Sequence, residues 1–198
     1  MIPSMAAVAM LALQPVADDA VDKRRDSDAL GWWAPDYVKL QTGGYAGLAA
    51  AGVGYAAFDD VLNASLLYGY VPALAAGRTV HSLHFALHGR PVELRFGPVR
   101  WIVSYAGIGV LHTWGDRYFI LLPARYAGGY YSPTGLHLTG HLGTEVDLVA
   151  GGASIFERHG LYLELCALEF YVRRYLRNPD SLGLSEVVSL AFGYRLAF

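Results

Sequence analysis

The last residues of the chain alternate between large apolar and small side chains, and this period constrains the fold more than any other feature. One face of the extended segment is bulky and apolar: Val188, Leu190, Phe192, Tyr194, Leu196 and Phe198. The other face is small and carries one arginine: Val187, Ser189, Ala191, Gly193, Arg195 and Ala197. Because successive side chains of a strand point to opposite sides, this segment predicts a β-strand with one wholly apolar face.

Four further segments show the same period of two, over residues 62–70, 80–88, 136–148 and 161–167. In each, one face is apolar and free of Lys and Arg, while the other carries His, Ser, Thr, small residues and a few charges. A soluble barrel would place the apolar face inside and the charged face outside. The long apolar faces favour the opposite arrangement, with lipid outside and a tight polar lumen inside.

The composition agrees with a membrane barrel and excludes other classes. Hydrophobic residues make up 54% of the 198 residues and charged residues 16%, whereas soluble domains carry about 25% charged residues. The net charge of −2 gives no basis for nucleic-acid binding. A spanning helix over Leu40–Phe58 would be long enough, but five glycines together with Gln41 and Thr42 make this segment too weakly hydrophobic.

The count of strands must be even in a bacterial single-chain barrel. Seven segments are predicted as strands: 44–58, 61–71, 79–90, 99–112, 135–148, 160–171 and 184–198. The eighth is either Arg117–Leu122 or a product of dividing Val38–Phe58. Loops are expected at 72–78, 123–134 and 173–183, and tight turns at Asp59–Asp60 and Gly97–Pro98. The predicted fold is an all-β antiparallel transmembrane barrel of eight strands.

The N-terminal part of the chain differs from the rest. Ala6–Leu13 is a short apolar stretch, followed by Pro15 and by charged residues from Asp18 onward. This pattern is typical of the core and cleavage region of a secretory signal peptide, although no basic residue precedes Lys23. The alternative is a buried or frayed segment. We therefore assign residues 1–36 to a signal-like and linker segment, and 37–198 to the barrel.

The final strand also resembles the C-terminal signature of bacterial outer-membrane proteins, which ends in an aromatic residue preceded by alternating apolar residues. Five residues match it position by position: Leu190, Phe192, Tyr194, Leu196 and Phe198. The resemblance implies recognition by the barrel-assembly machinery. More broadly, the chain from Val38 is similar to small uncharacterised Gram-negative outer-membrane barrel proteins, with segments such as LLYGYVP (66–72) and GYYSPTGLH (129–137). This similarity implies an outer-membrane location in contact with lipid, and no particular activity.

Histidines on the predicted lumen face raise the question of a metal site. His137 and His141 are four residues apart, which on a strand places them about 13 Å from each other, too far to share one ion. A cross-strand site using His84 would depend on an unknown register. We therefore expect no metal and no cofactor. The single cysteine, Cys166, lies among leucines and is interpreted as a small core residue.

Ser82, His84 and Glu164 could act as nucleophile, base and orienting group if they met in the lumen. Lipid-modifying barrel enzymes place such groups at the outer rim facing lipid, and their local motifs are absent here. A polar network is the simpler expectation, because buried charges need partners. Its predicted members are His84, His137, His141, Glu145, Asp147, Glu164 and Arg195.

The function expected from these observations is that of a monomeric, non-enzymatic outer-membrane barrel with a structural or small-ligand-binding role. Eight strands leave an interior just wide enough for side chains to fill, so a general diffusion channel is not expected. Two alternatives remain open at this point: a lipid-modifying outer-membrane hydrolase or acyltransferase, and a soluble lipocalin-like binder of an apolar ligand.

Overall fold

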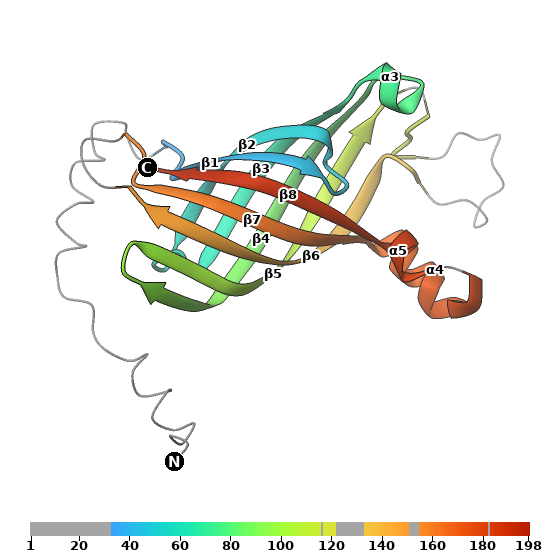
Figure 1. Ribbon diagram of the computed structural model, residues 1–198. Coiled ribbons are helices and arrows are strands. Elements are labelled where there is room, and N and C mark those ends of the chain that lie inside the picture. The colour runs from blue at the N-terminus through green and yellow to red at the C-terminus, as the bar shows by residue number, and fades with distance from the viewer. Residues whose placement is uncertain (1–32, 116, 122–132, 151–154, 182) are drawn as a thin grey trace, which may run out of the picture. The chain divides into compact units, whose positions relative to one another are not determined.

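Eight antiparallel strands form a closed barrel, in which each strand pairs with the next and the last pairs with the first (Figure 1). The computed structural model describes residues 33–115, 117–121, 133–150, 155–181 and 183–198. The strands are β1 (Tyr37–Gly43), β2 (Gly47–Ala57), β3 (Leu62–Val71), β4 (Val80–Phe96), β5 (Val99–Trp114), β6 (Leu136–Val149), β7 (Arg158–Leu168) and β8 (Val188–Ala197). The predicted all-β antiparallel barrel of eight strands is confirmed.

The eighth strand arises from the division of the segment 38–58 into β1 and β2. Gly43 and Gly44 adopt φ angles of 77° and 66° at the turn between them, a left-handed conformation that glycine adopts without steric cost. The other candidate strand, Arg117–Leu122, was wrong: residues 117–121 form a turn and a bend. This segment folds back instead, and the carbonyl oxygen of Phe119 accepts hydrogen bonds from the amides of Thr134 and Gly135.

Two predicted strands were too long at the same end of the barrel. Residues 169–171 belong to helix α4 (Glu169–Arg177), and residues 184–187 form helix α5 (Leu184–Val187). In α4, Glu169 lies in the first turn and Arg174 and Arg177 in the last, which suits the helix dipole. The predicted loops contain the later part of α4, the 3₁₀ helix η2 (Pro179–Ser181) and, between β3 and β4, helix α3 (Ala73–Ala76). Most of the predicted loop 123–134 lies outside the described residues.

The two ends of the barrel differ in the length of their connections. Tyr37 and Ala197 pair with each other at one end, which also carries the turn at residues 58–61 and the predicted turn at Gly97–Pro98. The opposite end carries α3, α4 and α5 (Figure 1). Among the described residues, no helix is both long and apolar enough to cross a membrane.

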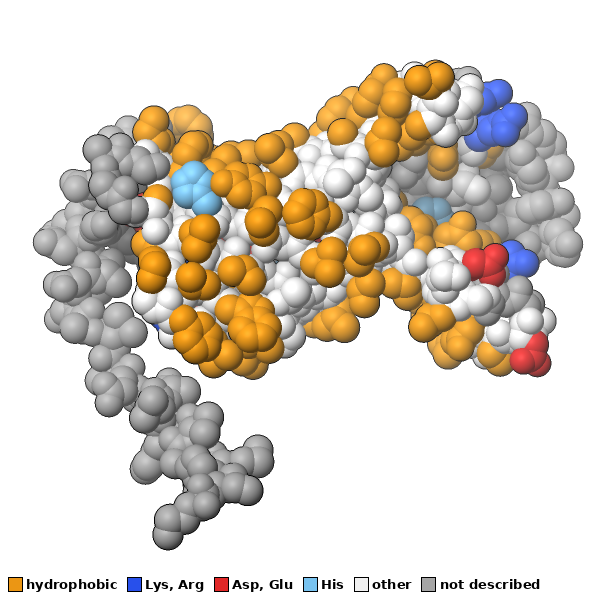
Figure 2. All heavy atoms as spheres, viewed as in Figure 1, with side chains coloured by type: hydrophobic (Ala, Val, Ile, Leu, Met, Phe, Trp, Pro, Cys, Tyr) orange, Lys and Arg blue, Asp and Glu red, His pale blue; other side chains and the backbone are white. Residues whose placement is uncertain are grey.

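The barrel wall separates apolar from polar side chains in the sense expected from the sequence. Leu138 and Leu190 point outward and are 60% and 55% exposed, whereas Asp147 and Arg195 point inward and are 2% and 4% exposed. In the face shown in Figure 2, hydrophobic side chains cover the barrel wall, and the visible Asp, Glu, Lys and Arg side chains lie mainly near the ends. The polar side of the sheet therefore lines the lumen.

Three tyrosines fill much of the lumen, and each lies against a glycine of the adjacent strand. A Cβ atom built on any of these glycines would overlap the tyrosine ring. Ring-over-glycine packing of this kind fixes the register of two strands, because only glycine leaves room for the ring. The pairs, each directly opposite in register, are Tyr37 with Gly54, Tyr105 with Gly143, and Tyr162 with Gly193.

Candidate functional site in the barrel lumen

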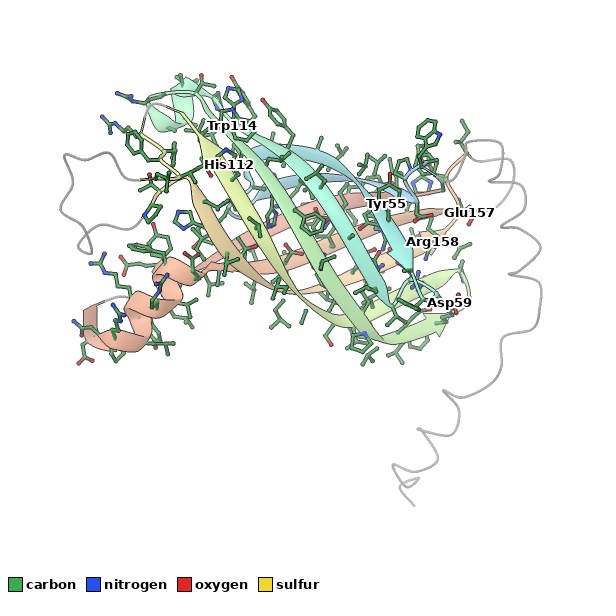
Figure 3. All side chains as sticks on the ribbon, turned by 180° about the vertical axis from the view of Figure 1, so that it is seen from behind. Tyr55, Asp59, His112, Trp114, Glu157 and Arg158 are labelled. Atoms are coloured by element: carbon green, nitrogen blue, oxygen red, sulfur yellow. The ribbon has the colours of Figure 1, made fainter. Side chains whose placement is uncertain are left out.

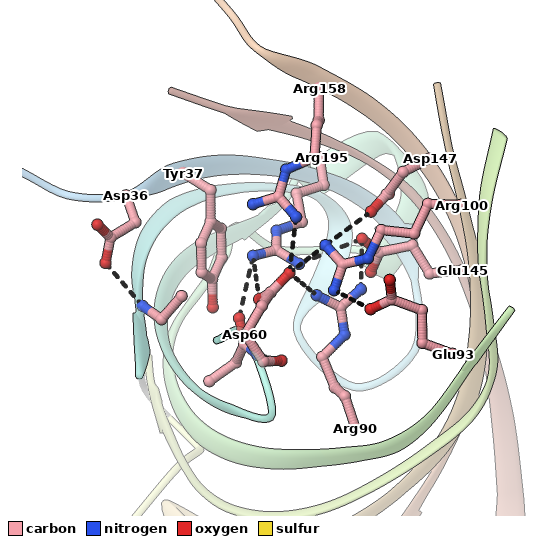
Figure 4. A network of polar contacts seen from close by, with 12 residues as sticks. Asp36, Tyr37, Asp60, Arg90, Glu93, Arg100, Glu145, Asp147, Arg158 and Arg195 are labelled. Carbon is pink, nitrogen blue, oxygen red and sulfur yellow. Dashed lines mark hydrogen bonds and ion pairs between the residues drawn. The ribbon is translucent and has the colours of Figure 1, made fainter. Parts of the chain in front are cut away.

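A single carboxylate, that of Asp60, lies at the centre of a cluster of arginines (Figure 4). Its Oδ2 atom accepts hydrogen bonds from Arg90, Arg100 and Arg158 at 3.0, 2.6 and 3.0 Å. Its Oδ1 atom accepts one from Arg195 at 2.9 Å. These contacts draw β4, β5, β7 and β8 toward the turn that joins β2 to β3.

The local backbone explains how a turn residue reaches the lumen. Phe58, Asp59 and Asp60 have φ angles of 55°, 55° and 68°, which is uncommon for residues other than glycine and best tolerated by Asp and Asn. The side-chain amide of Asn63 donates a hydrogen bond of 2.8 Å from Nδ2 to the backbone carbonyl oxygen of Asp60, which holds the turn in place. As a result the Asp60 side chain is only 7% exposed.

Further carboxylates balance the arginines. Glu145 lies 2.6 Å from Arg90 and 3.3 Å from Arg195. Arg100 lies 2.6 Å from Glu93 and 3.7 Å from Asp147. Four arginines thus form ion pairs with four acidic residues, as buried charges require. We call this set the arginine cluster: Asp60, Arg90, Glu93, Arg100, Glu145, Asp147, Arg158 and Arg195.

Glu145, Asp147 and Arg195 were proposed as lumen residues from the sequence, and the structure places all three in this cluster. Asp60 was missed because it was interpreted only as a turn residue. Arg90 was missed although a signal existed, since it continues the lumen face through His84 and His88 at a spacing of two. Arg100 could not be placed because bulges between β4 and β5 shift the register near it.

A second polar layer consists of histidines around Glu164. His141 Nδ1 lies 2.9 Å from Glu164 Oε1, and His88 Nε2 lies 3.3 Å from Glu164 Oε2. The Tyr105 hydroxyl donates to Glu164 Oε2 at 2.9 Å. The His84 ring packs in the same layer, with its centroid 4.9 Å from the centroid of the His141 ring. We call this set the histidine layer: His84, His88, Tyr105, His141 and Glu164.

Glycines on β5 allow histidines from β4 and β6 to meet. Gly107 is opposite His88 on one side and His141 on the other, and a Cβ atom there would lie 2.5 Å from the His88 ring. Gly109 likewise leaves space between His84 and Thr139, whose Nε2 and Oγ1 atoms are 3.0 Å apart. The side chains therefore meet across an intervening strand, which spacing along one strand cannot reveal.

The other residues considered from the sequence lie elsewhere or have other partners. The Ser82 hydroxyl donates to the Ala46 carbonyl oxygen, while His84 contacts Thr139. No hydrogen bond between Ser82 and His84 exists among the contacts of the described residues, so the predicted nucleophile and base are not brought together. His137 lies near α4, with its Nδ1 atom 3.4 Å from Glu169, and is not part of the histidine layer.

Little space remains between the two layers. A cavity of about 20 Å³ separates them, which is room for about one water molecule. It is lined by Tyr37, Lys39, Asn63, His88, Arg90, Tyr105, Glu145 and Arg195. Lys39 is buried, and its ammonium group lies 4.3 Å from the centre of the Tyr162 ring. The described lumen is therefore a packed polar core.

The five residues that resemble a C-terminal assembly signature lie on or beside the outer face of β8. Leu190 and Phe192 are exposed, and the Tyr194 hydroxyl lies 2.7 Å from His159 Nδ1. Leu196 is half-buried on the same face. Phe198 follows the strand, with its amide bonded to the Asp36 carbonyl oxygen and its ring 5.1 Å from that of Phe156.

These features define a class of protein: an eight-stranded antiparallel barrel with an apolar outer wall and a lumen filled by paired charges. No protein-family model matches the sequence, and no curated protein matches it. Among solved structures, the N-terminal β-barrel domain of OprF from Pseudomonas aeruginosa aligns with a TM-score of 0.39 and 12% identity, covering 83% of this chain and 98% of that one. A similarity at this level carries no information about activity.

Proposed function

We propose that this chain is an integral outer-membrane β-barrel protein with a structural role, whose lumen is closed by its own side chains. One observation carries the proposal: the barrel is apolar outside and charged inside. Leu142 on β6 is 54% exposed, whereas Glu145, three residues further along the same strand, is 4% exposed. A soluble lipocalin-like barrel requires the opposite polarity, so this observation disfavours that alternative.

The dimensions and the aromatic residues also support a membrane location. Seven of the eight strands contain 10–17 residues, and a tilted strand crosses a bilayer in about 9–11 residues. Trp114 lies near one end of the barrel and Tyr55 near the other (Figure 3). Tyr68, His81 and Trp114 form ring contacts at the first of these ends. Aromatic residues near both ends of the strands are typical of outer-membrane barrels.

The arginine cluster and the histidine layer argue against a diffusion channel. Both cross the lumen, and the cavity between them holds about one water molecule. We infer a monomeric protein that contacts outer-membrane lipid through its wall and is inserted by the barrel-assembly machinery through β8. An enzymatic role gains no support from the lumen, because Ser82 and His84 have separate partners.

Cell fractionation combined with two measurements on the purified protein tests the proposal. We expect the protein in the outer-membrane fraction, a shift in gel mobility on heating in detergent, and no steady ion conductance in a planar bilayer. Recovery in the soluble fraction would refute the membrane assignment. Stable single-channel conductance would refute the closed lumen while leaving the membrane assignment intact.

A further inference from the structure

We propose that His88, His141 and Glu164 form a binding site for one divalent transition-metal ion, with zinc as the best match to the donors. The three side chains come from β4, β6 and β7, and all three are buried. One ligand atom from each lies within 4.8 Å of the other two. Two imidazole nitrogens and a carboxylate oxygen are a donor set that binds zinc in proteins, usually with one further ligand.

The three donor atoms must move closer together to coordinate one metal ion. Ligand atoms around a tetrahedral zinc lie roughly 3.3 Å apart, given metal–ligand distances of about 2.0–2.1 Å. His141 Nδ1 lies 2.9 Å from Glu164 Oε1, and His88 Nε2 lies 3.3 Å from the other carboxylate oxygen, Oε2. All three ligand atoms lie within 4.8 Å of one another, so the widest pair must close by at most roughly 1.5 Å, which rotation of the side chains can supply.

The state of His88 points to a ligand. The residue is 5% exposed, and its Nε2 atom makes no hydrogen bond to any described group, although it lies 3.3 Å from Glu164 Oε2. A buried polar nitrogen without a hydrogen bond is costly and calls for an explanation. Coordination of a metal through the nitrogen lone pair would satisfy it.

The surroundings resemble the support that metal-binding histidines receive. His141 presents Nδ1 to Glu164, while its Nε2 atom lies 2.8 Å from Thr139 Oγ1. Such a bond to the second ring nitrogen fixes the tautomer and the orientation of a metal-binding histidine. The cavity beside His88 and Tyr105 offers space for a water molecule as the fourth ligand. Cys166, whose Sγ lies 3.3 Å from Glu164 Oε1, is a further donor beside this group.

The test uses the full chain without a polyhistidine tag, folded in detergent and stripped with a chelator. Cobalt(II) serves as a visible probe, and it is offered both to the folded protein and during refolding. We expect one cobalt per chain, the absorption bands of a tetrahedral site, displacement by zinc, and a higher unfolding temperature with zinc present. A sulfur charge-transfer band would identify Cys166 as the fourth ligand, and its absence would identify water.

Three variants locate the site: His88→Gln, His141→Gln and Glu164→Gln should each weaken cobalt binding by roughly tenfold or more. His137→Gln is the matched control, since it removes another histidine from the lumen side of β6 and should bind as the original chain does. Heat-modifiable gels show which variants fold. Less than one cobalt for every two chains under both loading conditions would overturn the proposal. A loss of cobalt binding in His137→Gln as large as that in the three site variants would also overturn it.

Discussion

Tyr162 on β7 lies directly opposite Gly193 on β8, and its ring occupies the space that a side chain at Gly193 would need. The Tyr162 hydroxyl reaches past β8 and donates to Gln41 Oε1 on β1 at 3.0 Å. One tyrosine therefore ties together the three strands at which the barrel closes. The glycine is required for packing rather than for backbone conformation.

Gly193→Ala should destabilise the barrel by about 1–3 kcal/mol, because the added methyl group overpacks a filled interior. Gly140→Ala on β6 is the control, since a Cβ there meets nothing within 4 Å. Urea unfolding in detergent or lipid vesicles, followed by tryptophan fluorescence, measures both. Equal urea-unfolding midpoints for the two variants would show that the Tyr162 ring can move away from position 193 without loss of stability.

Arg195→Ala should cost about 3–5 kcal/mol, because removing one partner leaves buried charge without compensation. Arg195 contacts Asp60 at 2.9 Å and Glu145 at 3.3 Å, and its guanidinium lies 3.9 Å from the centre of the Tyr37 ring. Arg95→Ala serves as the comparison, since that side chain is 64% exposed and an exposed ion pair is worth about 0–1 kcal/mol. An unchanged unfolding midpoint for Arg195→Ala would contradict the pairing.

The Asp60→Asn substitution removes the charge of Asp60 and keeps nearly the same side-chain shape. Asparagine has nearly the same size and also tolerates the left-handed conformation at this position, so the turn should persist. Four arginines then lose their shared carboxylate, and we expect a loss of about 3–5 kcal/mol in the free energy of unfolding. Asp59→Asn, at the exposed neighbouring position, should change it by less than about 0.5 kcal/mol. Similar losses in both would show that the turn, and not the ion pairs, carries the stability.

Leu142→Arg tests whether the outer wall faces lipid. Leu142 lies at the middle of β6 and Leu136 at its start, both on the exposed face. Arginine at the bilayer midplane costs about 2–4 kcal/mol and near an interface about 0–1 kcal/mol. Leu142→Arg should therefore destabilise the vesicle-inserted protein far more than Leu136→Arg. Without a dependence on depth, the wall is not in contact with a bilayer.

Phe198→Ala should separate assembly in cells from stability. The Phe198 backbone bond to Asp36 survives the substitution, and the ring lies beyond β8, so refolding in detergent should be nearly unchanged. If the C-terminal signature is recognised during assembly, the amount of folded protein in the outer membrane should fall. Quantitative blotting of the heat-modifiable form measures this, with Phe156→Ala, its ring partner, as the control. Normal insertion would remove the role proposed for the terminal residue.

The alternation of side chains predicted the barrel and its polarity because period two is a property of single strands. Glu145, Asp147, Glu164 and Arg195 were assigned to the lumen on this basis. Strand register is different, because it depends on pairing between distant segments. The meeting of His88 with His141 therefore could not be predicted, since it requires Gly107 to lie between them on a third strand.

Asp60 was beyond prediction for another reason. Its position follows from three successive residues with positive φ angles, and the dipeptide Asp59–Asp60 indicates a turn without showing which side chain enters the lumen. The additional strand was also ambiguous, because alternation is weak in the Ala- and Gly-rich β2. There the two glycines of the turn, Gly43 and Gly44, were the better signal.

The four arginines that contact Asp60 are far from it in the sequence, at separations of 30, 40, 98 and 135 residues. Closing long loops costs entropy before contacts repay it. A barrel that lacks β7 and β8 would keep only Arg90 and Arg100 for the four acidic residues of the arginine cluster. Because two of its four arginines lie on β7 and β8, the arginine cluster is complete only in the closed ring of eight strands.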